Sequence, residues 1–230
     1  MVRQVALIAG SVLALASAAN ASIAFSFADP VPGRQVANLQ NGAGPGLGLL
    51  TYDTGANIAF LVDDNELGGF GFTTFTNARL EVNLTLGAAV VMGGITLAPV
   101  SGTFSIYDFT GNVRTDILNG SSMAGAFVRV TGTNAIQFST ADGFSYSAGP
   151  ALQALLGGLR ILAPDQEAVF TLTDIATVGG GNFIGPGGVF RSFNANASFS
   201  GTSNTEIIPT PGAAALVGIA GLVAMRRRRA

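Results

Sequence analysis

The residues best suited to chemistry form one acidic cluster. It comprises Asp63, Asp64, Asn65 and Glu66, with Asp53 ten residues upstream. Carboxylate and amide oxygens in a loop suit Ca²⁺, which accepts such ligands in flexible geometry. An EF-hand register that starts at Asp63 is only partly met, because Leu67 and Thr74 occupy its fifth and twelfth positions. We favour a solvated acidic turn and keep Asp63, Asp64 and Glu66 as candidate Ca²⁺ ligands.

The composition removes most routes to catalysis. The chain has no histidine, cysteine or tryptophan, and its eleven basic residues are all arginine. Histidine is the usual general base and zinc ligand, while thiol and Ser-Lys chemistry need cysteine or lysine. A glycosidase needs two facing carboxylates and aromatic platforms, but only four glutamates and three tyrosines are present. We therefore expect no enzyme and no cofactor apart from the candidate Ca²⁺, with a carboxylate-only hydrolase as the least favoured alternative.

The sequence pattern predicts that the segments positioning these groups are β-strands almost throughout. In the clearest strand, residues 79–86, every second residue is apolar, so one face is buried and the other lies in water. The apolar set is Leu80, Val82, Leu84 and Leu86, and the polar set is Arg79, Glu81, Asn83 and Thr85. Similar runs begin at Ile23, Ile58, Phe104, Ile136, Val169 and Phe193. Roughly eight to ten short strands predict an all-β fold, an antiparallel, jelly-roll-like β-sandwich. We expect the sixteen phenylalanines to form its core.

One helix and two long loops interrupt this pattern. Leucines spaced i, i+3, i+4 and i+7 follow Pro150 and predict one short helix. They are Leu152, Leu155, Leu156 and Leu159. Glycine-rich segments at residues 31–48 and 178–188 predict loops, and neither contains the Gly-Lys-Ser or Gly-Lys-Thr of a phosphate loop.

The charge balance limits the possible partners. Residues 22–208 are enough for one well-buried domain and hold six arginines against thirteen acidic residues, a net charge of −7. An acidic surface repels phosphate backbones, so nucleic acid is not an expected partner. Without cysteine no disulfide can form, and the domain must depend on its hydrophobic core.

The N-terminus has the composition of a secretory signal. Arg3 precedes an apolar stretch at residues 5–19, and an A-x-A cleavage site follows, with Ala19 and Ala21 as its small residues. A first buried strand or helix is the alternative, which the small-residue site argues against. We expect residues 1–21 to be removed as a signal peptide and the protein to be exported.

The C-terminus reads as a membrane-directed tail in three parts. They are Pro209, Thr210, Pro211 and Gly212, then the apolar residues 213–225, and finally Arg226, Arg227, Arg228 and Arg229. The prolines keep the approach to the membrane extended and accessible. The thirteen apolar residues would span about 20 Å as a helix, against roughly 30 Å of hydrocarbon, so the span needs the residues from 207 onward. The arginines would stop the helix on the cytoplasmic side, and an ordinary anchor is one interpretation.

This order of motif, short apolar helix and arginine run resembles the PEP-CTERM sorting signal. The resemblance covers residues 207–229, about a tenth of the chain, and Thr210 stands where the family's Pro-Glu-Pro motif has Glu. Family members are exported bacterial proteins whose tails are processed by an exosortase, a membrane-embedded cysteine transpeptidase. The resemblance implies the export machinery and an exosortase-like transpeptidase as partners, and membrane contact through the C-terminal helix before processing.

Together these patterns predict a signal peptide at residues 1–21, a β-sandwich domain at 22–204, and a linker and sorting tail at 205–230. Our leading interpretation is a non-catalytic structural protein of the cell surface or extracellular matrix, anchored transiently in the inner membrane. The resemblance adds extracellular polysaccharide, as in a biofilm, to the expected partners. The alternative is a calcium-assisted glycan- or surface-binding module that uses the loop from Asp63 to Glu66.

Overall fold

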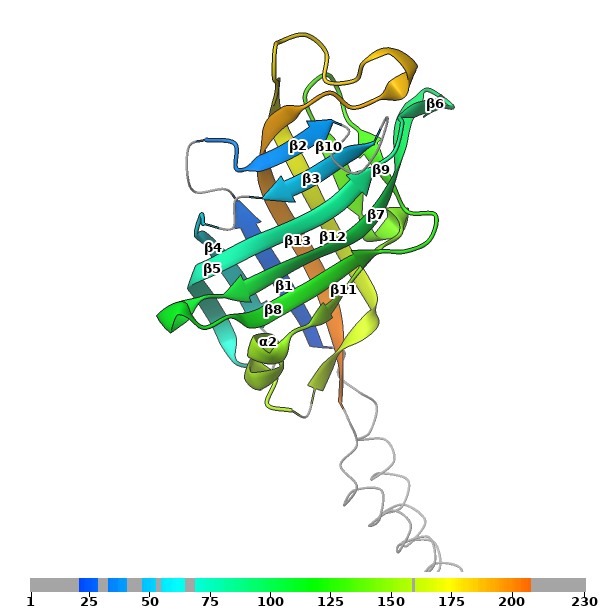
Figure 1. Ribbon diagram of the computed structural model, residues 1–230. Helices are drawn as coiled ribbons and strands as arrows, with labels where there is room; N and C mark the ends of the chain where they lie inside the picture. The colour runs from blue at the N-terminus through cyan, green and yellow to red at the C-terminus, as the bar shows by residue number, and fades with distance from the viewer. Residues whose placement is uncertain are drawn as a thin grey trace, which may run out of the picture.

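A computed structural model of the chain describes residues 21–28, 33–40, 47–52, 55–64, 69–158 and 160–207. These residues form thirteen β-strands, paired antiparallel, and one short α-helix, α2 (Pro150–Leu155) (Figure 1). The strands are β1 (Ala21–Ala28), β2 (Val36–Gln40), β3 (Gly48–Tyr52), β4 (Ile58–Asp64), β5 (Gly71–Leu86), β6 (Val90–Met92), β7 (Ile95–Asp108), β8 (Thr115–Ser122), β9 (Phe127–Val130), β10 (Ile136–Ser139), β11 (Phe144–Ala148), β12 (Arg160–Thr177) and β13 (Phe193–Ile207). The predicted all-β fold is confirmed for the described residues.

The strands are more numerous and longer than the sequence indicated. Thirteen are present where about eight to ten were expected, and β5, β7, β12 and β13 have 16, 14, 18 and 15 residues. These long strands run through residues that break the alternation. Pro99 and Gly102 lie within β7, and β12 has an irregularity between Leu162 and Gln166. Alternation therefore marks the buried middle of a strand and misses its extensions.

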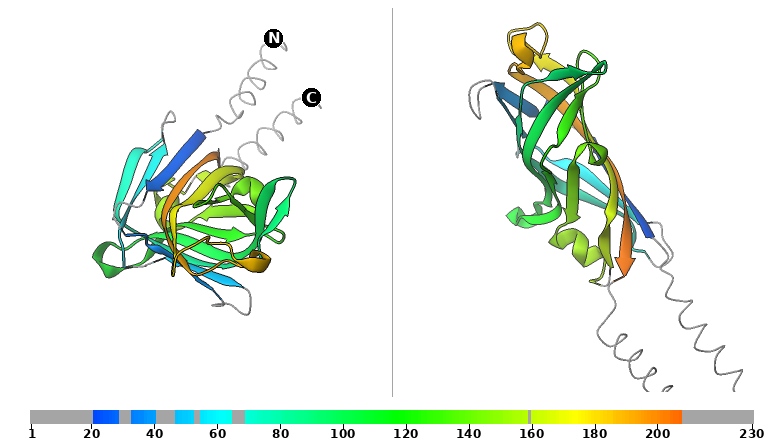
Figure 2. Two further views of the ribbon diagram at one scale, coloured as in Figure 1. Left: turned by 90° about the horizontal axis from the view of Figure 1, so that it is seen from above. Right: turned by 90° about the vertical axis from the view of Figure 1, so that its right-hand side faces the viewer.

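The strands form two layers that share hydrogen-bonded edges. In Figure 1, β3, β5, β7 and β8 lie in front, and β1, β12 and β13 cross behind them. One edge of β5 pairs with β4 through residues 71–78 and with β3 through residues 83–86. One edge of β13 is divided in the same way between β1 and β2. Because β1 also pairs with β4 and β2 with β3, the two layers are joined along one side (Figure 2). On the other side β10 pairs with β12 and β9, and β9 pairs with β7, so the layers are joined there as well.

An aromatic core fills the space between the layers. The predicted inward residues Leu80, Val82, Leu84 and Leu86 are each 4% exposed or less. The ring of Phe199 on β13 lies 6.2–6.3 Å from those of Phe27, Phe60 and Phe104. Burying one such side chain contributes roughly 1.5–3 kcal/mol, so this cluster is a main source of stability. The expectation that all sixteen phenylalanines are in the core is wrong for Phe72, which is 65% exposed.

The two ends of the molecule differ. Ala21 in β1 pairs with Thr205, and Arg160 in β12 pairs with Ile207. The first and last described residues of the chain therefore lie at the same end of the molecule, here called the tail end. The predicted helix is confirmed as α2, which begins at Pro150 and packs on β8 and β11 near the tail end (Figure 1). The opposite end, here called the loop end, carries the β6–β7 hairpin and residues 178–192.

Candidate functional site

The outward side of four neighbouring strands carries small polar side chains in register. Eight of these side chains, here called the polar face, are Glu81, Asn83, Thr103, Ser105, Asn119, Ser121, Ser145 and Ser147. The inward residues between them, such as Val82 and Leu118, are buried in the core. Because successive side chains of a strand point to opposite sides, the alternation places these polar groups together on β5, β7, β8 and β11.

The polar face is organised as two cross-strand rows. One row is Asn83, Thr103, Ser121 and Ser145, and the other is Glu81, Ser105, Asn119 and Ser147. Neighbouring strands lie about 4.8 Å apart, and residues two apart along a strand are separated by roughly 6.7 Å. Hydroxyl and amide groups, which both donate and accept hydrogen bonds, therefore repeat on a regular grid.

Arg114 lies at one edge of the polar face and contacts several of its side chains. Its guanidinium lies 4.3 Å from the centre of the Tyr107 ring and donates to the Ser105 hydroxyl at 2.7 Å. It also donates to Asp116 Oδ1 at 2.8 Å and forms an ion pair with Glu81. Burial disfavours the charged form, but the hydrogen bonds and charges of Asp116 and Glu81 outweigh it and raise the pKa of Arg114. The guanidinium is therefore a permanent cation that holds Ser105 in place and covers Tyr107.

An open pocket of about 300 Å³ lies on the polar face beside Arg114. Asn83, Thr103 and Asn119 line it with uncharged polar groups. The carboxylate of Glu81 also borders the pocket, but it is already bound to Arg114. This arrangement suits a polar, uncharged unit such as a sugar ring, which the amides and hydroxyls can hold by hydrogen bonds.

The candidate Ca²⁺ ligands lie at the end of β4, and the structure gives Asp64 a different partner. Asp64 is 1% exposed, forms an ion pair with Arg160 of β12 and accepts the Phe70 N–H at 3.1 Å. The expected solvated turn is wrong for Asp64, because its side chain is buried and Arg160, 96 residues away, supplies an opposite charge. Asp63 is its neighbour on β4, and Glu66 lies outside the described residues. Within the described residues, no three acidic side chains gather as a metal site would require.

Most of the predicted processing residues fall outside the described part of the chain. Ala21 is the first residue of β1. Ala19, Pro209, Thr210, Pro211, Gly212, Arg226, Arg227, Arg228 and Arg229 lie outside the described residues. In the residues that are described, no helix is long and apolar enough to cross a membrane. The sorting tail stays a prediction.

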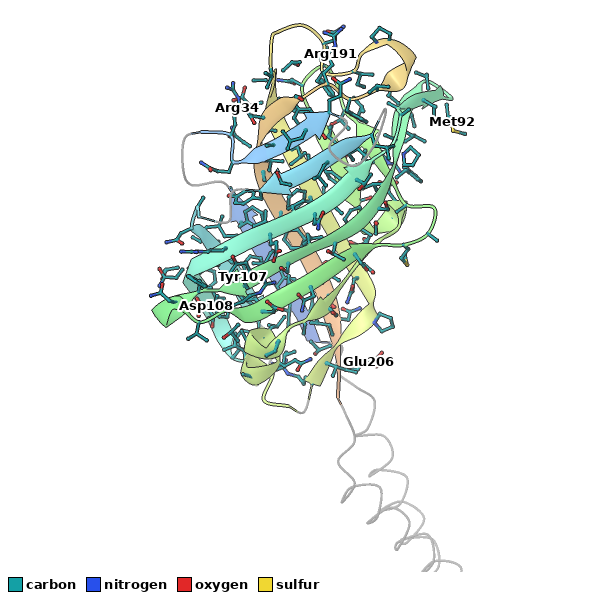
Figure 3. All side chains as sticks on the ribbon, in the orientation of Figure 1. Arg34, Met92, Tyr107, Asp108, Arg191 and Glu206 are labelled. Atoms are coloured by element: carbon teal, nitrogen blue, oxygen red, sulfur yellow. The ribbon has the colours of Figure 1, made fainter. Side chains whose placement is uncertain are left out.

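Sequence inspection missed the roles of the arginines. Five of the six between residues 22 and 208 have a side-chain partner: Arg34 with Asp174, Arg79 with Asn57, Arg114 with Glu81, Arg129 with Asp142 and Arg160 with Asp64. The sixth, Arg191, lines a pocket at the loop end (Figure 3). Within the described residues its guanidinium has no hydrogen bond or ion pair. The one sequence feature that could have indicated the pocket around Arg191 is the glycine-rich segment that precedes this residue.

No protein-family model matches the chain, and no curated protein matches it. Among solved structures, one match is the InvG secretin domain β-barrel from the Salmonella SPI-1 injectisome NC-base, at 12% sequence identity. This match covers 97% of the present chain and 74% of that chain, with a TM-score of 0.14. A likeness of this degree supports no inference about the fold or function of the present chain.

Proposed function

We propose that this protein is an exported, non-catalytic structural component of an extracellular polysaccharide matrix, and that its polar face lies against the polysaccharide. The observation that carries the proposal is the pair of in-register rows of hydroxyl and amide groups on β5, β7, β8 and β11. A polysaccharide presents hydroxyl groups at regular intervals and can exchange hydrogen bonds with successive strands of such a surface. The antiparallel, jelly-roll-like sandwich serves as its rigid support.

The energetics of such a surface suit a matrix protein better than a receptor for one sugar. A single hydrogen bond contributes only about 0.5–1.5 kcal/mol, because it replaces a hydrogen bond to water. Many such contacts along one polymer act together, so avidity rises with the length of the bound chain. We therefore expect weak binding of short oligosaccharides and firm retention on long ones.

The placement of the chain ends supports the proposed route of export. β1 and β13 lie side by side, and both ends of the described fold leave at the tail end (Figures 1 and 2). In our proposal the signal peptide and the PEP-CTERM-like tail extend from there, and the tail anchors the protein transiently in the inner membrane before an exosortase-like transpeptidase processes it. The loop end would then point away from the membrane toward the matrix.

Affinity electrophoresis tests the polar face. The exported protein should be retarded in gels that contain the host's extracellular polysaccharide or neutral dextran. The double variant Asn83→Ala with Asn119→Ala should lose most of this retardation, because it removes one amide from each row. The matched control is Asn194→Ala with Thr202→Ala, two exposed polar residues of β13 in the other layer.

The outcome separates the proposed function from its alternative. Equal retardation of the polar-face variant and the control would overturn the proposal. Retardation that EDTA abolishes and CaCl₂ restores would instead favour the calcium-assisted binding module at Asp63, Asp64 and Glu66.

A further inference from the structure

A second polar pocket lies at the loop end. It has a volume of about 450 Å³ and opens beside Arg191, which Figure 3 places at the opposite end of the molecule from Glu206. Its lining includes Gln40, Val178, Pro186, Val189, Arg191 and Ser192. The pocket therefore combines one cation, two polar side chains and three apolar ones.

The guanidinium of Arg191 has no internal counter-charge. Within the described residues it forms no hydrogen bond and no ion pair, unlike the other five arginines of the fold. Gly181 and Gly185 border it, and a Cβ at either position would lie 3.2 Å from a guanidinium nitrogen. The missing side chains leave the cation open to the pocket. An arginine in this position can bind an external anion with two hydrogen bonds.

The backbone that presents Arg191 is firmly supported. Its N–H donates to the Phe183 carbonyl at 2.8 Å, and its carbonyl accepts the side-chain amide of Asn38 at 2.9 Å. The Phe183 ring lies 6.1 Å from that of Phe190 and 6.0 Å from that of Phe193, and all three rings are buried. A glycine-rich segment anchored in this way holds its pocket ready, so little order is lost when a ligand binds.

The rest of the lining fits a sugar ring. Val178, Pro186 and Val189 offer apolar surface to the C–H groups of a ring. The Ser192 hydroxyl accepts the backbone N–H of Gln40 at 3.1 Å, and its own hydrogen can be donated to a ligand. An anion that also carries apolar C–H surface and hydroxyl groups matches this set better than a small inorganic anion does.

We propose that this pocket binds a uronate unit, a sugar ring that bears a carboxylate, of an acidic extracellular polysaccharide. The carboxylate would accept two hydrogen bonds from the Arg191 guanidinium, and the ring would lie on Val178 and Pro186. This inference rests on the proposed function and adds a ligand class to it. The polar face would bind along the polymer, while the Arg191 pocket would select an acidic unit.

Calorimetric titration of the exported protein with trigalacturonate tests the site. Arg191→Gln should weaken binding at least about tenfold, since a charge-assisted pair of hydrogen bonds is lost. Arg191→Lys should retain part of the affinity, because lysine keeps the charge but not the planar geometry. The methyl ester of trigalacturonate should bind the wild type no better than trigalacturonate binds Arg191→Gln. Arg34→Gln is the matched control, because Arg34 lies outside the pocket lining and its exposed side chain contacts the carboxylate and the backbone carbonyl of Asp174.

Two results would overturn the inference. Equal affinity of the wild type and Arg191→Gln for trigalacturonate would exclude the pocket. Inorganic phosphate that competes as well as trigalacturonate would exclude the sugar ligand. Electrophoresis in neutral dextran, run in parallel, reports on the polar face alone. Retardation in dextran without Arg191-dependent binding would refute this site and leave the proposed function standing.

Discussion

Asp64→Asn removes the negative charge from the buried ion pair that connects β4 to β12. The side chain of Asp64 is 0% exposed and that of Arg160 is 17% exposed. Removing one member of a buried pair costs about 3–5 kcal/mol, because the remaining charge stays buried without compensation. Arg160 keeps some contact with water, so we expect a loss of about 3 kcal/mol, the lower end of this range. For a domain of this size the melting temperature should fall by about 6–12 °C.

Urea unfolding followed by circular dichroism measures the free energies of unfolding that this prediction needs. The set comprises the wild type, Asp64→Asn, Arg160→Gln and the double variant. The double variant should lose less stability than the two single losses added together, because it leaves no unpaired charge. Asp174→Asn is the matched control, because its pair with Arg34 is 56% and 40% exposed and should contribute less than about 1 kcal/mol.

A loss in Asp64→Asn no larger than that in Asp174→Asn would refute the buried pair. Melting in millimolar CaCl₂ and in EDTA gives a second readout, since a ligand that binds only the folded state raises its stability. A calcium-dependent rise in melting temperature that disappears in Asp64→Asn would show that Asp64 binds the ion and not only Arg160.

Three further predictions concern the sandwich. Leu84→Asp should abolish folding or secretion, because it buries an unpaired charge. Glu81→Gln should change the free energy of unfolding by less than about 1 kcal/mol, because its ion pair is exposed. Circular dichroism of the two variants compares these effects. Burial raises the pKa of Tyr146, so this tyrosine ionises at lower pH in the unfolded state and the free energy of unfolding should fall above about pH 10. Between pH 9 and about 11.5, the free energy of unfolding of Tyr146→Phe should depend less on pH than that of the wild type. Gly102→Ala should destabilise by about 1–3 kcal/mol in urea, because φ is +128° and a Cβ would meet the Asn83 carbonyl.

The sequence predicted which side chains face the core because that depends only on local period. Phe25, Phe60 and Phe199 occupy alternating positions and are buried as expected. Local period carries no information about partners. Nothing in residues 71–86 indicates that β5 pairs with β4 along one part of an edge and with β3 along another.

Charged groups were harder to predict than apolar ones. Phe109 and Phe127 look like core residues, but each lies beside an arginine, with Arg79 4.0 Å from the first ring centre and Arg129 5.8 Å from the second. The first pair joins residues 30 apart and the second joins two residues of β9, and neither leaves a periodic signal in the sequence. The polar face shows the same limit, since the outward residues of β5 were predicted but their alignment with β7, β8 and β11 depends on register.

The pairing of β1 with β13 sets the order in which this chain can fold. In the proposed export the chain crosses the membrane N-terminus first, so β1, β2 and β12 emerge before β13, the neighbour that they share. Bringing together segments this distant in sequence costs chain entropy before their contacts form, which makes folding slow. During this interval the unpaired strand edges are open to aggregation with other copies. A tail that stays in the membrane until β13 has docked would keep unfolded copies apart, and its processing would then release only folded molecules.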